Sequence, residues 1–240
     1  DLANTPVGNG PFAVSEFVRD TSLTLARRDD YWGQKPTVKT VTFKYFDDVN
    51  SQIAALQSGG IDAISGLPDL NTLDQFKGSD KFDVVEGNST NKWTLSMNNS
   101  AAPFNDLKVR QAINYAIDRQ ALLLAVANGY GKVTGSFVPP SDPWYEDLSG
   151  AYPFDPEKAK ALLAEAGASN LSFQFDVPNL PAAVAAAQVI KSDLANIGVT
   201  ADVKTMEFPA TWLDTGFTKA DYQMSIIGHV ESRDLPIYGN

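Results

Sequence analysis

Residues 171–205 have the sequence LSFQFDVPNLPAAVAAAQVIKSDLANIGVTADVKT. The runs at 171–177 and 200–205 are typical of strands. Between them, apolar side chains recur at helical spacing and predict a long helix over 181–197, with an inner face of Ala186, Val189, Ile190, Leu194 and Ile197. Gly198 ends this helix. A strand, a helix and a strand in this order favour an α/β fold.

Three more helices are expected before this segment, each with a polar N-cap. Asn105 or Asp106 can begin a helix whose apolar stripe consists of Val109, Ala112, Ile113, Ala116 and Ile117. Asp118 can cap a second helix and Asp155 a third. Strands are expected at 92–98 and 222–228. The segment 133–150 is rich in Pro and Gly and has no period, which predicts an ordered surface loop.

The N-terminal part shows a similar alternation. Residues 40–46 alternate as a strand does, and the helical pattern that follows ends at the glycine pair 59–60. Residues 61–64 are expected to form the next strand, which makes a βαβ unit with a right-handed crossover. A short helix is expected within 66–76 and another strand at 82–87.

Composition excludes several classes of protein. The chain has 240 residues, 19 Lys plus Arg, 29 Asp plus Glu, and a net charge of −10. Because nucleic-acid binders carry excess positive charge, no nucleic-acid partner is expected. The chain has no Cys, which excludes disulfides, thiolate metal sites and cysteine nucleophiles. No run of about 18 apolar residues is present, so no transmembrane helix is expected.

Signals for catalysis are weak. A Ser-His-Asp set would have to use His229, the only histidine, and no Gly-x-Ser-x-Gly sequence accompanies it. The chain has no Walker A sequence, and Gly8-x-Gly10 lacks the third glycine of a dinucleotide site. The chain is therefore not expected to be an enzyme.

Six sequence segments, in order along the chain, carry a family resemblance: GNGPF at 8–12, RDDYW at 28–32, ALQSGGID at 55–62, PFNDLKVRQAINYAIDR at 103–119, YPFDPEKAK at 152–160 and LLAEAG at 162–167. They resemble segments of the extracytoplasmic solute-binding proteins of peptide and nickel ABC transporters (family 5). Asn9 departs from the pattern, since the family has Thr there.

The resemblance implies a type II periplasmic-binding-protein-like fold, in which two lobes joined by a hinge enclose a ligand cleft. Members of the family are about twice this long, so the chain is expected to be a fragment. Residues 1–92 then form the middle segment of the first lobe, and 93–240 form the second lobe without its last part.

The implied function is the binding of peptides outside the membrane and their delivery to the transmembrane permease of an ABC importer. The protein is expected to be a monomer without a cofactor, in the periplasm or tethered to the cell surface as a lipoprotein. Two alternatives remain open. One is a binder of nickel or another small solute within the family, and the other is a secreted hydrolase that uses His229.

The resemblance also points to ligand-binding residues after the strand at 222–228. In peptide-binding members a carboxylate there binds the ligand's N-terminal ammonium, and Glu231 and Asp234 both remain candidates, with Asp234 preferred. Arg233 can pair with either acid, bind a ligand carboxylate, or form a surface ion pair. His229 stands where the family has Trp, and it can be a buried imidazole, a ligand contact or a metal ligand.

Two more stretches resemble cleft-lining parts of the family. Pro68 and Leu70 follow the expected βαβ unit, and Trp93, Ser96 and Asn98 lie on the strand expected to cross between the lobes. No metal site is expected, because no second His or Cys exists to complete one.

Overall fold

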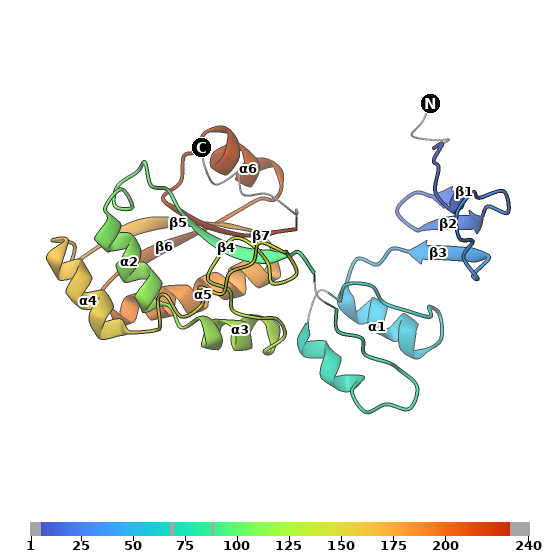
Figure 1. Ribbon diagram of the computed structural model, residues 1–240, viewed down its shortest axis with the longest axis horizontal. Coiled ribbons are helices and arrows are strands. Elements are labelled where there is room, and N and C mark those ends of the chain that lie inside the picture. The colour runs from blue at the N-terminus through green and yellow to red at the C-terminus, as the bar shows by residue number, and fades with distance from the viewer. Residues whose placement is uncertain (1–5, 68–69, 88, 231–240) are drawn as a thin grey trace. The chain divides into compact units, whose positions relative to one another are not determined.

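The computed structural model describes residues 6–67, 70–87 and 89–230. The chain divides into two compact units, Asp1–Asp69 and Leu70–Asn240, shown in Figure 1. The assignment of 1–92 and 93–240 to two lobes of a longer protein stays a prediction.

The first unit contains a three-stranded antiparallel sheet. Strands β1 (Phe12–Val18), β2 (Ser22–Arg27) and β3 (Thr40–Lys44) lie in the order β1-β2-β3. In the register of this sheet, Leu23 lies between Phe17 and Phe43. Directly opposed side chains share a face, so these three residues form an apolar row across the sheet. Only β3 was predicted from the sequence.

Helix α1 (Val49–Gln57) follows β3, and the Asp48 carboxylate accepts a hydrogen bond from the Ser51 backbone N–H at 2.9 Å. Gly59 has a φ of +77°, which confirms the predicted glycine stop. The predicted strand at 61–64 is wrong, and so is the βαβ unit. The reason is local, because Ile61 donates its backbone N–H to the Ala55 carbonyl at 3.2 Å and so continues the helix end.

The predicted strand at 82–87 is also wrong, since these residues form no regular element. Phe82 instead packs edge-on against Phe76, with the ring centroids 5.3 Å apart. Phe82 thus makes a local aromatic contact, whereas Val85 in the same run is 88% exposed. The short 3₁₀ helix η1 (Leu70–Gln75) confirms the helix expected within 66–76.

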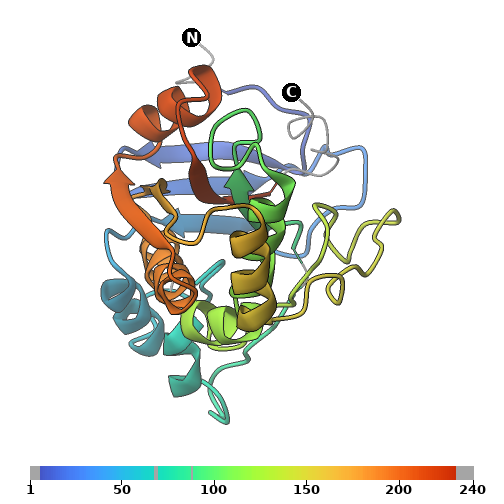
Figure 2. The same ribbon diagram turned by 90° about the vertical axis from the view of Figure 1, so that its left-hand side faces the viewer.

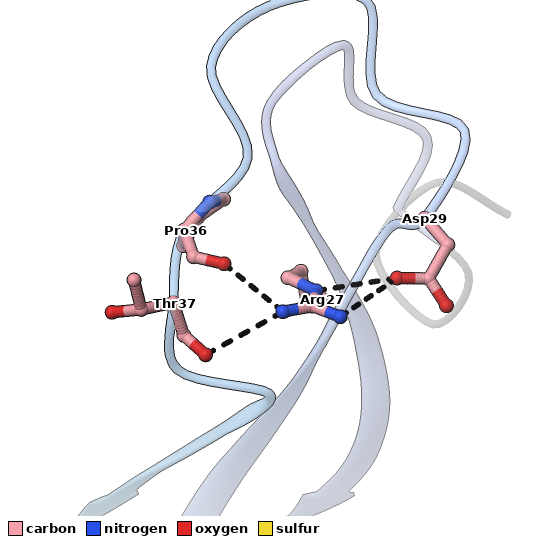
Figure 3. Close-up of polar contacts among 4 residues, drawn as sticks. All are labelled: Arg27, Asp29, Pro36 and Thr37. Atoms are coloured by element: carbon pink, nitrogen blue, oxygen red, sulfur yellow. Dashed lines mark hydrogen bonds and ion pairs between the residues drawn. The ribbon is translucent and has the colours of Figure 1, made fainter.

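Arg27 closes the long loop between β2 and β3 (Figure 3). Its guanidinium donates to one carboxylate oxygen of Asp29, from Nε at 3.2 Å and from Nη2 at 3.0 Å. From Nη1 it donates to the backbone carbonyls of Pro36 at 3.1 Å and Thr37 at 3.4 Å. Arg28, in turn, donates to the Gly8 carbonyl at 2.7 Å. The segments 8–12 and 28–32 therefore act here as scaffold.

The second unit is built on a four-stranded sheet in the order β4-β7-β5-β6. The strands are β4 (Lys92–Met97), β5 (Ser172–Pro178), β6 (Thr200–Met206) and β7 (Met224–His229). Strand β5 is parallel to both β6 and β7, whereas β4 is antiparallel to β7. All four strands confirm the sequence prediction.

Four helices cover one face of this sheet. They are α2 (Leu107–Ala116), α3 (Arg119–Ala127), α4 (Pro156–Glu165) and α5 (Pro181–Asn196). The carboxylates of Asp106, Asp118 and Asp155 accept backbone N–H groups as the N-caps of α2, α3 and α4. Figure 2 shows α2 and α4 side by side. The segment 133–150 has no regular element, as predicted.

The core lies between these helices and the sheet. Phe173, Phe175 and Val177 of β5 point into it, and each is at most 3% exposed. Since side chains alternate along a strand, Gln174 and Asp176 lie on the other face. Helix α6 (Ala210–Leu213) and a π-helical turn, η2 (Asp214–Thr218), lie on that face, opposite α5 (Figure 1). The sequence did not predict them.

Candidate functional site

The carboxyl ends of the three parallel strands meet at one edge of the second unit's sheet. Strands β5, β6 and β7 end there at Pro178, Met206 and His229, and the antiparallel β4 begins there at Lys92. Ligands of open α/β sheets bind outside the carboxyl ends of the strands. The structure therefore places His229 at the edge where a ligand site is expected.

Lys92 lies directly opposite His229 in the register of β4 and β7. Opposed residues share a face, so the ammonium and the imidazole belong to the same side of the sheet. Lys92 is only 6% exposed, and His229 is partly buried. Lysine is almost never buried without a partner or a role. Both side chains can donate hydrogen bonds to an oxygen acceptor such as a carboxylate.

Trp93 is on β4 next to Lys92 and is opposite Gly228. Its side chain belongs to the other face of the sheet and is 45% exposed. Gly228 permits the close approach, because a Cβ at this position would lie 3.3 Å from the indole ring and 2.8 Å from Oδ1 of Asn91. At this edge the pleat thus separates a polar pair, Lys92 and His229, from an aromatic surface.

The other predicted residues on β4 lie farther from His229. Ser96 is opposite Ser225, in the middle of the sheet. Asn98 follows the far end of β4, where its side-chain amide donates to the carbonyls of Ala220 at 3.1 Å and Tyr222 at 3.0 Å. These hydrogen bonds connect the turn after β4 to the segment that precedes β7, so they stabilise the fold.

Leu70 is the first residue of η1 and is partly buried. The predicted residues Pro68, Glu231, Arg233 and Asp234 lie outside the described residues. Their roles, like those of the other predicted site residues, stay predictions. Within the part of the chain that the structure describes, no group of three or more His, Cys, Asp or Glu could hold a metal ion.

One buried acid was not singled out from the sequence. Asp176 on β5 is 1% exposed, and its Oδ1 accepts a hydrogen bond from Nε2 of Gln174 at 2.6 Å. Burial raises the pKa of its carboxyl group above the usual range. Ser225 joins this strand to α6, since its hydroxyl donates to the Asp176 carbonyl at 2.7 Å and accepts from Nε1 of Trp212 at 2.9 Å.

The pattern in 171–177 does contain a signal for Asp176. Polar Ser172, Gln174 and Asp176 alternate with the apolar core residues, which predicts a polar and solvent-facing side of the strand. The structure covers this side with α6, whose only buried residue is Trp212. On β4, Lys92 likewise belongs to a polar set that alternates with apolar residues, but this pattern did not predict that Lys92 is buried.

Comparison with known proteins identifies the family. The family described as "Bacterial extracellular solute-binding proteins, family 5 Middle" matches residues 1–238. The chain belongs to this family. Family 5 consists of solute-binding proteins of ABC importers, which are not enzymes, and the likeness on residues 8–167 noted from the sequence is confirmed.

Individual family 5 relatives differ in their ligands. The chain is 34% identical to heme-binding protein A of Haemophilus influenzae over 86% of its length and 39% of the relative's. It is 33% identical to the dipeptide-binding protein of Escherichia coli over 85% of its length and 39% of the relative's. The chain thus spans about two fifths of the length of these curated relatives.

A solved periplasmic binding protein has a similar fold. The periplasmic binding protein DppA of Helicobacter pylori, in complex with the peptide STSA, superimposes with a TM-score of 0.79 at 28% identity, covering 96% of this chain and 44% of the other. The fold is therefore that of the type II periplasmic binding proteins, represented in part. Among the described residues, no helix is both long and apolar enough to cross a membrane.

Proposed function

We propose that the chain belongs to the extracytoplasmic component of an ABC importer that binds peptides between two lobes and delivers them to the permease. The family match over residues 1–238 carries this proposal. The dipeptide-binding relative and the peptide-bound DppA structure favour peptides as ligands. The periplasm, or the cell surface with a lipid tether, is the proposed location, and the proposed state is a monomer.

The carboxyl edge of the four-stranded sheet supports a ligand site of this kind. Lys92 and His229 lie opposite each other there, and their side chains are of the kind that donates hydrogen bonds to a carboxylate or a carbonyl of a peptide. The half-exposed Trp93 offers an apolar surface for a side chain. Among the residues that follow β7 in the sequence, we propose Asp234, with Glu231 as its alternative, as the carboxylate for the peptide's ammonium. Arg233 would then pair with an acid of the protein or of the ligand.

A peptide that contacts both lobes shifts the protein toward its closed state, because closure is favoured only by contacts that the open state lacks. Such binding stabilises the folded protein by about 2.7 kcal/mol when the ligand is at 100 times its Kd.

Thermal unfolding of the full-length protein with di- and tripeptides, hemin and Ni²⁺ in separate samples tests the ligand class. We expect an increase in Tm with peptides alone. An increase only with hemin or with Ni²⁺ would overturn the peptide assignment.

The site is tested by variants in the same assay. His229→Ala should weaken peptide binding, whereas Asp202→Asn, on the exposed part of β6, should leave it unchanged. Asp234→Asn should weaken binding of free-amine peptides more than of N-acetylated peptides, and equal losses would favour Glu231. Hydrolysis of a peptide or ester that is lost in His229→Ala would show that the protein is an enzyme and contradict the proposal.

A further inference from the structure

Asp176 is a buried acid with an incomplete set of partners. Its Oδ1 accepts from Gln174 at 2.6 Å, while its buried Oδ2 has no hydrogen-bond partner among the described residues. A carboxylate has two oxygens that need donors when it is ionised. Burial without them disfavours the charged form.

Helix α6 lies on the face of the sheet that carries this acid, which is 1% exposed (Figure 1). Trp212 on α6 is 4% exposed, and its Nε1 donates to the Ser225 hydroxyl at 2.9 Å. Ser225 is opposite Asp176 in the parallel pair of β5 and β7 and donates to the Asp176 carbonyl at 2.7 Å. Trp212 therefore contacts the sheet at the residue beside Asp176, so release of Trp212 would also uncover Asp176.

The charges around Asp176 do not neutralise it. Lys204 is opposite Asp176 on β6, but its ammonium donates to Oε1 of Gln174. Desolvation raises the pKa of Asp176, and the negative charges of Asp221 before β7 and Asp202 on β6 add to this rise. The hydrogen bond from Gln174 and the charge of Lys204 lower the pKa but do not cancel the rise. On the cover itself, Asp214 is paired with Lys219 at 2.5 Å. On β7, the facing residue is the neutral Ser225.

We propose that Asp176 is a proton-operated latch for the segment 207–218, which stays closed over the neutral acid and opens when the acid ionises. Ionised Asp176 gains hydration only if Trp212 leaves the sheet, so loss of the proton favours opening. The acid has its ordinary pKa when open and a raised pKa when closed. The equilibrium constant for opening therefore increases between about pH 4 and the raised pKa, by up to tenfold per pH unit. Above the raised pKa it is constant. This inference does not depend on the proposed function.

Hydrogen–deuterium exchange of the full-length protein, followed by mass spectrometry, measures this opening. Protection factors, which remove the intrinsic pH dependence of exchange, are compared for residues 210–218 and for α5 between pH 4 and pH 8. In the wild type, we expect protection of 210–218 to fall with pH while that of α5 is unchanged. In Asp176→Asn, which is neutral and of similar shape, protection of 210–218 should be independent of pH.

Asp202→Asn is the matched control, because it removes a neighbouring but exposed carboxylate on β6. Protection of 210–218 should still fall with pH in this variant, in contrast to Asp176→Asn, because the buried acid is retained. A wild-type protection factor of 210–218 that is constant over this range would overturn the latch, whether or not Asp176→Asn folds. A pH-dependent profile that survives in folded Asp176→Asn would assign the effect to another group.

Discussion

Gly135 lets the loop over residues 133–150 run against its own backbone. A Cβ at this position would lie 2.0 Å from the carbonyl carbon of Leu148 and 2.4 Å from the Ser149 nitrogen. Both atoms belong to the backbone, so no side-chain rotation can relieve the clash. Only a residue without a Cβ fits the loop as it stands.

Gly135→Ala is therefore expected to separate the two loop segments and to lower the free energy of unfolding by about 1–3 kcal/mol, the usual cost of overpacking. Gly150→Ala in the same loop is the control, because a Cβ there has no atom within 4 Å. It should change stability by less than about 0.5 kcal/mol. Urea denaturation measures both variants, and equal stabilities would refute the close approach.

At the scale of elements, three helices of the second unit, α2, α3 and α4, begin at aspartate caps. The Asp118 carboxylate accepts the backbone N–H groups of Gln120 and Ala121, both at 3.0 Å, and so begins α3. Its own N–H donates to the carboxylate of Asp193 on α5 at 3.1 Å. Asp118 thus links the start of one helix to the side of another.

Asp118→Ala should lower the free energy of unfolding by about 0.5–2 kcal/mol, because two N–H groups lose their acceptor. Asp118→Asn keeps an acceptor oxygen and removes the repulsion from Asp193, so it should stay close to the wild type. The midpoints of thermal unfolding distinguish the two. A loss in Asp118→Asn as large as in Asp118→Ala would show that the charge, rather than the cap, supports α3.

At the scale of the whole molecule, two desolvated acids contribute to the pH dependence of stability. Burial raises the pKa of Asp176 and of Asp193 in the folded state. The folded protein therefore holds these protons more tightly than the unfolded chain. The contribution of these two groups to stability is largest below their ordinary carboxyl pKa and is lost as pH rises toward their raised pKa.

The Asp176 contribution predicts a free energy of unfolding that decreases between about pH 4 and neutral pH, less steeply in Asp176→Asn than in the wild type. Urea denaturation at a series of pH values measures the slope. Asp202→Asn, which removes an exposed charge and retains the buried acid, should keep a steeper slope than Asp176→Asn. Identical slopes for Asp176→Asn and the wild type would contradict the burial of an acid at this position.

Local signals predicted most of the second unit. The caps at Asp106, Asp118 and Asp155 act within one turn of a helix, and the apolar alternation in 171–177 acts within one strand, so neighbouring residues suffice to reveal them. The strand predicted at 61–64 is wrong because a strand forms only when it pairs with another, and the residues within 61–64 do not reveal whether a pairing partner is present. Helix α6, of four residues, was too short to give a periodic signal.

The sequence by itself determined the α/β class, the N-caps of three helices, the positions of the second unit's strands along the chain and, through its family segments, the solute-binding family. Tertiary structure alone decided that Lys92 meets His229, that Trp93 belongs to the other face, and that α6 buries Asp176. The reason is physical. Caps and periodicity depend on residues a few positions apart, whereas strand pairing and the burial of a charge depend on residues that are distant in the chain.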